Sequence, residues 1–178
     1  MFAVVDCETT GLSRNARIVE LSVMLIDQNE RKIVRAYNTL INPQCDTGPQ
    51  HIHGISNSMV KSAPVFSEIA GVLTHLLDGN ILVAHNLSFD SRMIKQEFDR
   101  IRVNFSSGRG YCTYKLTRLK LEKACLKYGV KILKAHEALS DTMAAAELIM
   151  CFYDRLPKAE SVEIENIFSE QNWKTLNR

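Results

Sequence analysis

The sequence predicts a single α/β domain in which three consecutive strands are followed by helices that alternate with a further strand. The chain has 178 residues, a length typical of one domain, and 46% of them are apolar, which is enough for a full core. Apolar residues alternate with polar ones in the first part of the chain and recur at helical spacing from Phe66 onward. We therefore expect one domain over residues 1–178, with a core at about 2–153 and a helical tail at 158–178.

The composition predicts a cytoplasmic protein with no membrane partner. The net charge is +2, and the five cysteines are widely spaced without a Cys-x-x-Cys pair, which is typical of reduced thiols. The apolar run at residues 2–5 is too short for a signal peptide and leads directly into acidic residues. No apolar run approaches the roughly 20 residues that a membrane-spanning helix needs.

Strands are expected to fill the first part of the chain. Residues 2–5 form an apolar run that predicts a buried strand. Residues 19–25 alternate between apolar and other side chains, and the polar turn 27–30 ends this second strand. A third alternating run, residues 33–41, follows at hairpin distance. Three such strands in succession predict an antiparallel meander.

Residues 44–55 have the composition of a loop and contain His51 and His53. Two histidines at this spacing could bind zinc, but no third ligand lies nearby in the sequence. We therefore favour a loop that contacts the active site or the substrate.

Helical spacing begins with the amphipathic helix predicted at residues 66–77. The short apolar run 81–84 lies between a turn and a polar motif, which predicts a fully buried strand. The helix that follows should place Asp90 in its first turn. Polar residues after a buried strand lie where open α/β sheets bind ligands.

The last part of the chain is predicted to contain a loop and two helices. Residues 104–110 read as the loop, and Thr113 is a candidate N-cap for a basic helix that Gly129 ends. His136 opens the final helix, and its expected apolar stripe consists of Leu139, Met143, Ala146, Met150 and Tyr153. The basic helix carries several cations, including Lys115, Arg118, Lys120 and Lys123. These could bind a polyanion or could simply be solvated.

Asp6 and Glu8 are the first candidates for chemistry. Residues two apart in a strand point to the same face, so these carboxylates should project together, with Cys7 packed and inert on the other face. A hard divalent cation with oxygen ligands, Mg²⁺ or Mn²⁺, would relieve their repulsion. Taken alone, the pair could also be ordinary surface acids.

Asp90, His136 and Asp141 have similar alternatives. An acid in the first turn of a helix stabilises the helix dipole, so Asp90 could have only that role. His136 could be a polar residue exposed to water. Asp141 lies five positions later, about 140° away around a regular helix, so the two can flank one site only if His136 precedes the first regular turn.

The order and spacing of these residues resemble the DnaQ-like (DEDDh) 3′-to-5′ exonucleases, which include the proofreading epsilon subunit of bacterial DNA polymerase III. The resemblance covers residues 2–153 and rests on several segments. These are Asp6-x-Glu8-Thr9-Thr10-Gly11-Leu12, Arg17-Ile18-Val19-Glu20-Leu21, Ile52-His53-Gly54-Ile55, Val83-Ala84-His85-Asn86-x-x-Phe89-Asp90 and His136-x-Ala138-Leu139-x-Asp141. It implies a ribonuclease-H-like fold, with a mixed five-stranded sheet flanked by helices.

The resemblance also implies a role for each candidate residue. Asp6 would bridge two divalent cations, Mg²⁺ or Mn²⁺, and Glu8 and Asp141 would complete the first site. Asp90 would hold the second cation largely through water, and His136 would take the proton from the attacking water. Binding of the terminal nucleotide is implied for Thr9, Thr10, Gly11, Leu12, His53, Asn86 and Phe89.

The expected activity is removal of nucleoside monophosphates from a single-stranded or frayed 3′ end, with DNA favoured over RNA. An exoribonuclease that trims RNA is the alternative enzyme. A protein distinguishes RNA from DNA by contacts with the 2′-hydroxyl, and no residue of the sequence indicates or excludes such a contact. A catalytically silent module that binds 3′ ends is the alternative from another class. A DNA polymerase subunit is a further partner that the resemblance suggests.

Overall fold

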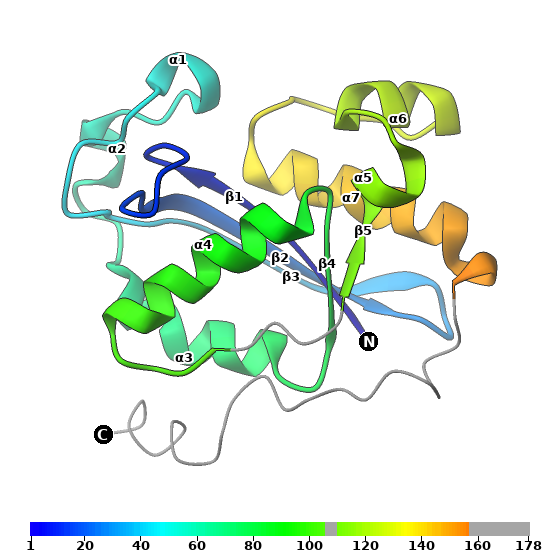
Figure 1. Cartoon of the computed structure of the whole chain (residues 1–178), viewed down its shortest axis with the longest axis horizontal. Helices are drawn as coiled ribbons and strands as arrows, with labels where there is room; N and C mark the ends of the chain where they lie inside the picture. The colour runs from blue at the N-terminus through cyan, green and yellow to red at the C-terminus, as the bar shows by residue number, and fades with distance from the viewer. Residues whose placement is uncertain (106–109, 157–178) are drawn as a thin grey trace.

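The computed structural model describes residues 1–105 and 110–156, so the predicted tail at 158–178 lies outside the described residues. Figure 1 shows a central sheet flanked by helices. The strands are β1 (Phe2–Thr9), β2 (Ile18–Asp27), β3 (Lys32–Leu40), β4 (Ile81–Ala84) and β5 (Gly110–Cys112). The helices are α1 (Gln50–His53), α2 (Asn57–Val60), α3 (Phe66–Leu77), α4 (Leu87–Arg100), α5 (Thr113–Thr117), α6 (Leu121–Tyr128) and α7 (Ala138–Phe152), followed by a 3₁₀ turn (Tyr153–Arg155).

The sheet is mixed, with the strand order β3-β2-β1-β4-β5. β1, β2 and β3 pair antiparallel as the predicted meander, while β4 and β5 run parallel to β1. This five-stranded mixed sheet confirms the predicted ribonuclease-H-like architecture. The carboxyl ends of β1 and β4 therefore point to the same edge of the sheet.

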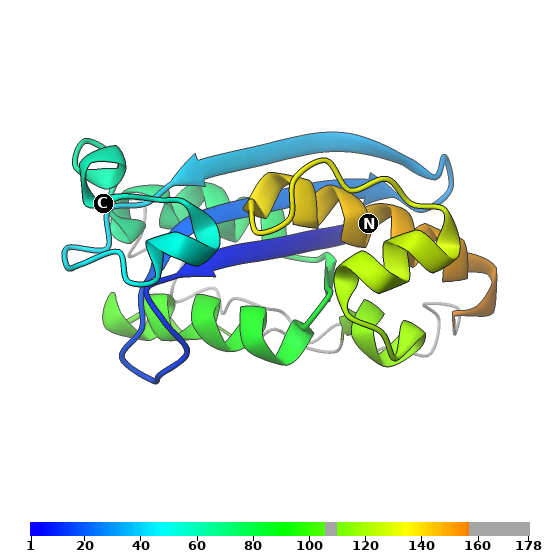
Figure 2. The same cartoon turned by 90° about the horizontal axis from the view of Figure 1, so that it is seen from above.

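Helices cover both faces of the sheet. On one face, alternate residues of β1 such as Ala3 and Val5 pack against α3 and α4. On the other face, Phe2 and Val4 pack against α7, and α6 packs on the outer side of α7. Figure 2 shows the strands with α4 running along one side. β2 is buried along nearly its whole length because both of its faces are covered.

Several predicted elements differ in detail. Residues 44–55 are not wholly loop, because α1 lies within them and α2 follows directly. The predicted basic helix is two helices, since Arg118 adopts a left-handed conformation (φ 58°) that ends α5. Thr113 is the first residue of α5 rather than its N-cap, which is Cys112, whereas Gly129 ends α6 as predicted.

The final helix has no single apolar stripe. Leu139, predicted to face inward, is 36% exposed, and Met143 and Met150 are only partly buried. The reason is that α7 lies between the sheet and α6, so alanines and larger side chains are buried on two sides of it. A helix buried on two sides carries a weak amphipathic pattern.

Candidate active site

The four predicted carboxylates and the predicted histidine line one cleft of about 650 Å³. Asp6 and Glu8 come from β1, Asp90 from the first turn of α4, and Asp141 from the first turn of α7. α4 and α7 lie on opposite faces of the sheet, and both begin near the carboxyl ends of β1 and β4. The fold thus brings together acids that are far apart in the sequence.

Asp6 and Glu8 share the face of β1 that packs toward α7, as their spacing predicts. Burial and, next, the charges of Asp90 and Asp141 hold the pKa of Asp6 well above its ordinary value. Burial and the charge of Asp141 raise the pKa of Glu8 to about 7. These carboxyls therefore favour a state in which protons or cations neutralise them.

Asp90 is 3% exposed and receives two hydrogen bonds from Cys7. The Cys7 backbone N–H donates to Asp90 Oδ1 over 3.2 Å, and the thiol donates to the same oxygen over 3.3 Å. Burial raises the pKa of Asp90 to about 7, although these two hydrogen bonds act in the opposite direction. Cys7 is packed on the other face of β1, as predicted, but it also contacts a candidate metal ligand, which its sequence position did not indicate.

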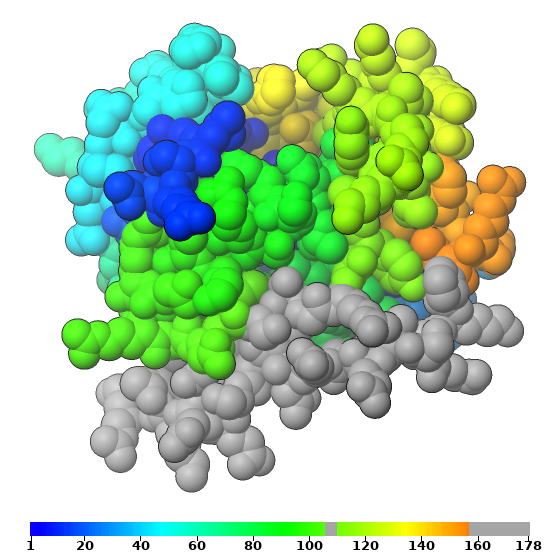
Figure 3. Space-filling view, in the orientation of Figure 1, coloured from blue at the N-terminus to red at the C-terminus, as the bar shows by residue number. Residues whose placement is uncertain are grey.

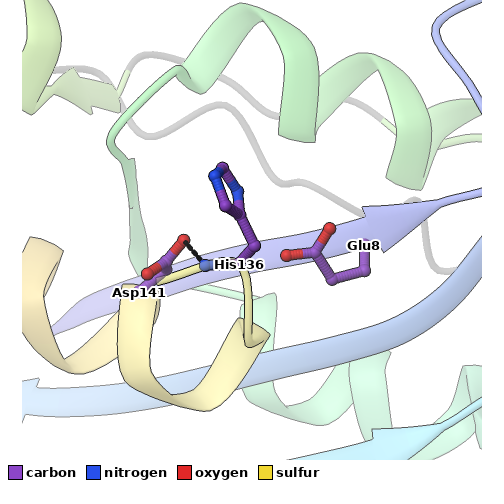
Figure 4. A group of neighbouring side chains, drawn as sticks. All are labelled: Glu8, His136 and Asp141. Carbon is purple, nitrogen blue, oxygen red and sulfur yellow. Dashed lines mark hydrogen bonds between the residues drawn. The ribbon is translucent and has the colours of Figure 1, made fainter. Parts of the chain in front are cut away.

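His136 and Asp141 meet because His136 precedes the regular helix. His136 has a left-handed backbone (φ 59°), and its backbone N–H donates to Asp141 Oδ2 over 3.2 Å. Figure 4 shows this bond, with the Glu8 carboxylate directed toward the same pair. Burial raises the pKa of Asp141 to about 6, against the hydrogen bond and charge of His136. His136 therefore precedes the first regular turn of α7, which is the condition under which His136 and Asp141 can flank one site.

This donor set fits a hard divalent cation. Ligand atoms of Glu8, His136 and Asp141 lie within 4.8 Å of one another. Asp141 Oδ1 is buried and has no hydrogen-bond partner among the described residues, so a cation would satisfy an oxygen that the protein leaves unpaired. Oxygen-rich, carboxylate sites suit Mg²⁺ and Mn²⁺.

A family model described as "Exonuclease" matches residues 3–149, most of the chain and all of the cleft acids. The chain belongs to this exonuclease family. The resemblance to the DEDDh exonucleases seen in the sequence is thereby confirmed.

Two curated relatives of this exonuclease domain are much longer proteins. A PolC-type DNA polymerase III from Caldanaerobacter subterraneus subsp. tengcongensis is 32% identical over 99% of this chain and 13% of its own length. A 3′-5′ exonuclease DinG from Staphylococcus saprophyticus is 28% identical over 93% of this chain and 19% of its own length. The chain therefore spans less than a fifth of either relative.

A solved structure shows the same fold. It is E. coli Exonuclease I in complex with a dT13 oligonucleotide, with a TM-score of 0.76 at 16% identity. The match covers 89% of this chain and 42% of that chain. None of the helices in the described ranges of the exonuclease domain is long and apolar enough to cross a bilayer.

Three of the predicted nucleotide-binding residues line the exonuclease cleft, namely Leu12, Asn86 and Phe89. Leu12 is 79% exposed, so its apolar side chain is open to contact with a ligand in the cleft. Thr9, Thr10 and Gly11 are not among the cleft-lining residues, but they connect the end of β1 to Leu12, with Thr9 as the last residue of the strand. Thr9 Oγ1 donates to the Gly11 carbonyl oxygen over 2.8 Å.

The loop that carries Leu12 is anchored at its far end. The Arg17 guanidinium forms two hydrogen bonds to the buried Glu97 carboxylate on α4, over 2.8 and 3.1 Å. Gly48, in a left-handed conformation (φ 78°), packs so closely on Thr10 that a Cβ at this position would overlap the Thr10 carbonyl group. The loop is thus held against two separate parts of the domain.

His53 does not line the cleft. It is 7% exposed, and both ring nitrogens have partners in its own segment. Nε2 lies 3.2 Å from the Thr47 carbonyl oxygen, and the Ile55 backbone N–H donates to Nδ1 over 3.0 Å. Burial lowers the pKa of His53. In this structure the ring stabilises the fold of its own segment, and its predicted contact with the substrate remains a prediction.

Glu20 is a buried acid near the site to which the sequence assigned no role. It lies directly across the β1–β2 ladder from Glu8 and is 8% exposed. Its carboxylate accepts a hydrogen bond from Asn38 Nδ2 and another from the Ala138 backbone N–H in the first turn of α7, each over 3.2 Å. A carboxylate in the interior of a strand that is buried along nearly its whole length was the signal that could have identified it. The exonuclease site therefore has a further acid that ties β2 to the start of the helix carrying Asp141.

Proposed function

We propose that this domain is a two-metal-dependent 3′-to-5′ exonuclease that removes nucleoside monophosphates from single-stranded or frayed 3′ ends of DNA. The observation that carries the proposal is the convergence of Asp6, Glu8, Asp90, Asp141 and His136 on one cleft. The relatives named DNA polymerase III PolC-type and 3′-5′ exonuclease DinG support both the direction and the choice of DNA.

Four carboxylates would hold the two cations, and these are Asp6, Glu8, Asp90 and Asp141. Bound divalent cations neutralise the charge that develops on the attacking and leaving oxygens when a phosphodiester is hydrolysed. The protein supplies ligands whose pKa values are raised by burial first and, for Asp6, Glu8 and Asp90, also by the charges of other acids in the set, so they gain from binding positive charge. Each ligand is carried by a strand or by the first turn of a helix, which keeps the set rigid.

His136 would act as the general base. Its side chain is exposed in the cleft, so a ring nitrogen can accept a proton from water there. Its backbone is held by Asp141, so the ring and this carboxylate keep a fixed relation. Leu12 and Phe89 would bind the terminal nucleotide beside this group. Contacts of this apolar and aromatic kind tolerate every base.

The test uses single strands labelled at either end, in DNA and in matched RNA. We expect mononucleotides to be released from the 3′ end with Mg²⁺ or Mn²⁺ and no release in excess chelator. Release from the 5′ end, or full activity in chelator, would overturn the proposal. Faster loss of RNA than of DNA would assign the domain to RNA trimming. Binding of 3′ ends without hydrolysis would indicate a silent binding module.

The PolC relative also supports a polymerase as the protein partner of this domain. We expect proofreading or repair, in which a frayed primer end passes from the polymerase to the cleft. Co-purification of the domain with a DNA polymerase subunit, and faster removal of a mismatched than a matched primer end, would test this. Equal rates on both ends would count against proofreading.

A further inference from the structure

The wall of the cleft formed by α5 and α6 lies outside the exonuclease motifs, and of its cleft-lining residues only Lys120 has a possible role predicted from the sequence, as one of several cations that could bind a polyanion. Tyr114, Lys120 and Leu121 line the cleft from this wall. Leu12 and Phe89 line it from the β1–β2 loop and α4. Figure 3 shows the loop and α4 (blue and green) beside the α5–α6 segment (yellow-green) on the same face of the molecule.

The chemistry of the proposed function requires a ligand on both walls. An exonuclease cleaves the last phosphodiester bond, so the reacting phosphate has one nucleotide on each side. Figures 1 and 2 show the starts of α4 and α7, which carry Asp90 and Asp141, between the β1–β2 loop and the α5–α6 segment. If the terminal nucleotide lies against the loop and α4, the nucleotide that precedes it lies toward α5 and α6.

Tyr114 has the properties of a stacking platform. It is 46% exposed, yet its position is fixed by its neighbours. Its backbone N–H donates to the His85 carbonyl oxygen over 3.0 Å, and its ring meets the His85 ring edge-on at 6.0 Å between centroids. His85 is held in turn, since its Nδ1 lies 2.9 Å from Thr113 Oγ1. A ring that is already ordered loses little conformational entropy when a base stacks on it.

Lys120 supplies the positive charge on this wall. Of the residues described as lining the cleft, it is the one lysine or arginine. It is exposed and forms the N-cap of α6, where the chain resumes after the break at Arg118. Within the described ranges it forms no ion pair with a carboxylate, so its charge is available to a phosphate. Lys115, Arg118 and Lys123 are exposed as well, but they do not line the cleft.

We propose that Tyr114 and Lys120 form a binding site for the nucleotide that precedes the 3′-terminal one, with Tyr114 stacking on its base and Lys120 pairing with its 5′ phosphate. This inference rests on the proposed exonuclease function and deepens it. It commits the domain to substrates of at least two nucleotides for full activity.

The experiment compares two substrates that differ only in having this second nucleotide. One is the p-nitrophenyl ester of thymidine 5′-monophosphate, which offers a single nucleotide, and the other is a dT8 oligonucleotide. The measured quantity is the ratio of kcat/KM on dT8 to kcat/KM on the ester. Tyr114→Ala should lower this ratio by about 5- to 150-fold, the effect of losing one base–aromatic stack. Tyr114→Phe keeps the ring and should restore most of it.

Lys120 is tested by salt dependence. Binding of dT8 is followed by fluorescence anisotropy with Ca²⁺ in place of Mg²⁺ at several salt concentrations. Lys120→Gln should reduce the slope of log affinity against log salt by about 0.7, the contribution of one phosphate contact on a single strand. Lys127→Gln is the matched control, because Lys127 is an exposed lysine on the same helix that does not line the cleft. It should leave the slope unchanged.

The outcomes separate this inference from the proposed function. An unchanged substrate ratio in Tyr114→Ala and an unchanged slope in Lys120→Gln, with dT8 still degraded by the wild type, would overturn the site and leave the exonuclease proposal intact. Equal losses on both substrates would show that Tyr114 only supports the fold of the cleft, which also overturns the site. If the wild type hydrolyses neither dT8 nor the ester, the exonuclease proposal itself is refuted.

Discussion

Replacing Asp90 by asparagine tests whether the cleft is built to hold positive charge. Burial raises the pKa of Asp90 from 3.8 to about 7, so between these values the folded protein keeps a proton that the unfolded chain releases. A folded state that binds more protons loses stability as the pH rises. Without metal, the carboxyl of Asp90 therefore stabilises the fold least above pH 7, and Asp90→Asn removes this dependence.

The expected size follows from the width of the pH window. Each pH unit in which the folded state keeps one extra proton costs about 1.4 kcal/mol. From pH 5 to pH 7 this amounts to about 3 kcal/mol, an upper value because Asp6 shares the same burial and repulsion. For a domain of this size, 3 kcal/mol corresponds to a shift in Tm of about 6–12 °C. The asparagine can keep the oxygen that accepts the hydrogen bonds from Cys7.

The assay is thermal unfolding in chelator at pH 5, 6, 7 and 8 for the wild type and Asp90→Asn. The Tm of the variant should gain on that of the wild type as the pH rises and then level off above pH 7. Saturating Mn²⁺ at pH 8 should reverse the order, because the wild type binds the cation better. Asp99→Asn, which removes an exposed acid from the same helix, is the matched control. Parallel pH profiles for the wild type and Asp90→Asn in chelator would refute the reasoning.

Three further pairs of variants probe other parts of the site. His136→Ala should cut turnover by about 10²- to 10⁴-fold, with partial recovery at high pH, while Mn²⁺ affinity measured by calorimetry stays close to that of the wild type. Asp141→Asn should weaken both turnover and Mn²⁺ affinity. If His136→Ala loses as much Mn²⁺ affinity as Asp141→Asn, then His136 is a metal ligand. Glu20→Ala should lower the free energy of unfolding by about 1.5–3 kcal/mol and also weaken Mn²⁺ binding, because the first turn of α7 loses a hydrogen-bond acceptor. Glu20→Gln should keep most of the stability and most of the Mn²⁺ affinity. Equal losses in the two variants would show that the charge of Glu20 matters rather than its hydrogen bond. Gly48→Ala should lower stability and activity more than Gly54→Ala, since both glycines have positive φ but of the two only Gly48 packs against the backbone of Thr10. Equal losses in the two variants would show that the loop after β1 can shift to make room for the added methyl group.

Much of the fold was predictable because the relevant signals are local. The meander, α3, β4 and α4 each carry a periodic or uninterrupted apolar pattern, and each lies where the pattern predicted. β5 was assigned to no residues, because Gly110–Cys112 is too short for a period to appear, and what defines it is parallel pairing with β4. A strand of this kind is defined by pairing with a segment distant in the sequence, so its own residues carry no local pattern from which it could be predicted.

The acids of the site were predictable for a different reason. Asp6 and Glu8 lie in the second half of β1, and Asp90 and Asp141 lie in the first turns of α4 and α7. The family resemblance interprets their spacings, and the structure brings all four to one cleft. The side chains that support or extend them have no such spacing. Tyr114 faces the cleft because the chain turns into α5 directly after β5. The position of this turn depends on the pairing of β5 with β4, which has no local signal in the sequence.

The placement of the four acids also explains why the domain can tolerate so much repulsion between them. Asp90 and Asp141 occupy the first turns of α4 and α7, where the helix dipole favours negative charge. These two helices pack on opposite faces of the sheet, and Asp6 and Glu8 project from the central strand β1. The distance between the two helix-borne acids is therefore set by the thickness of the packed layers rather than by loops. Core packing holds the carboxylates close together against their repulsion, and binding of divalent cations should release that stored energy at the place where the proposed chemistry needs positive charge.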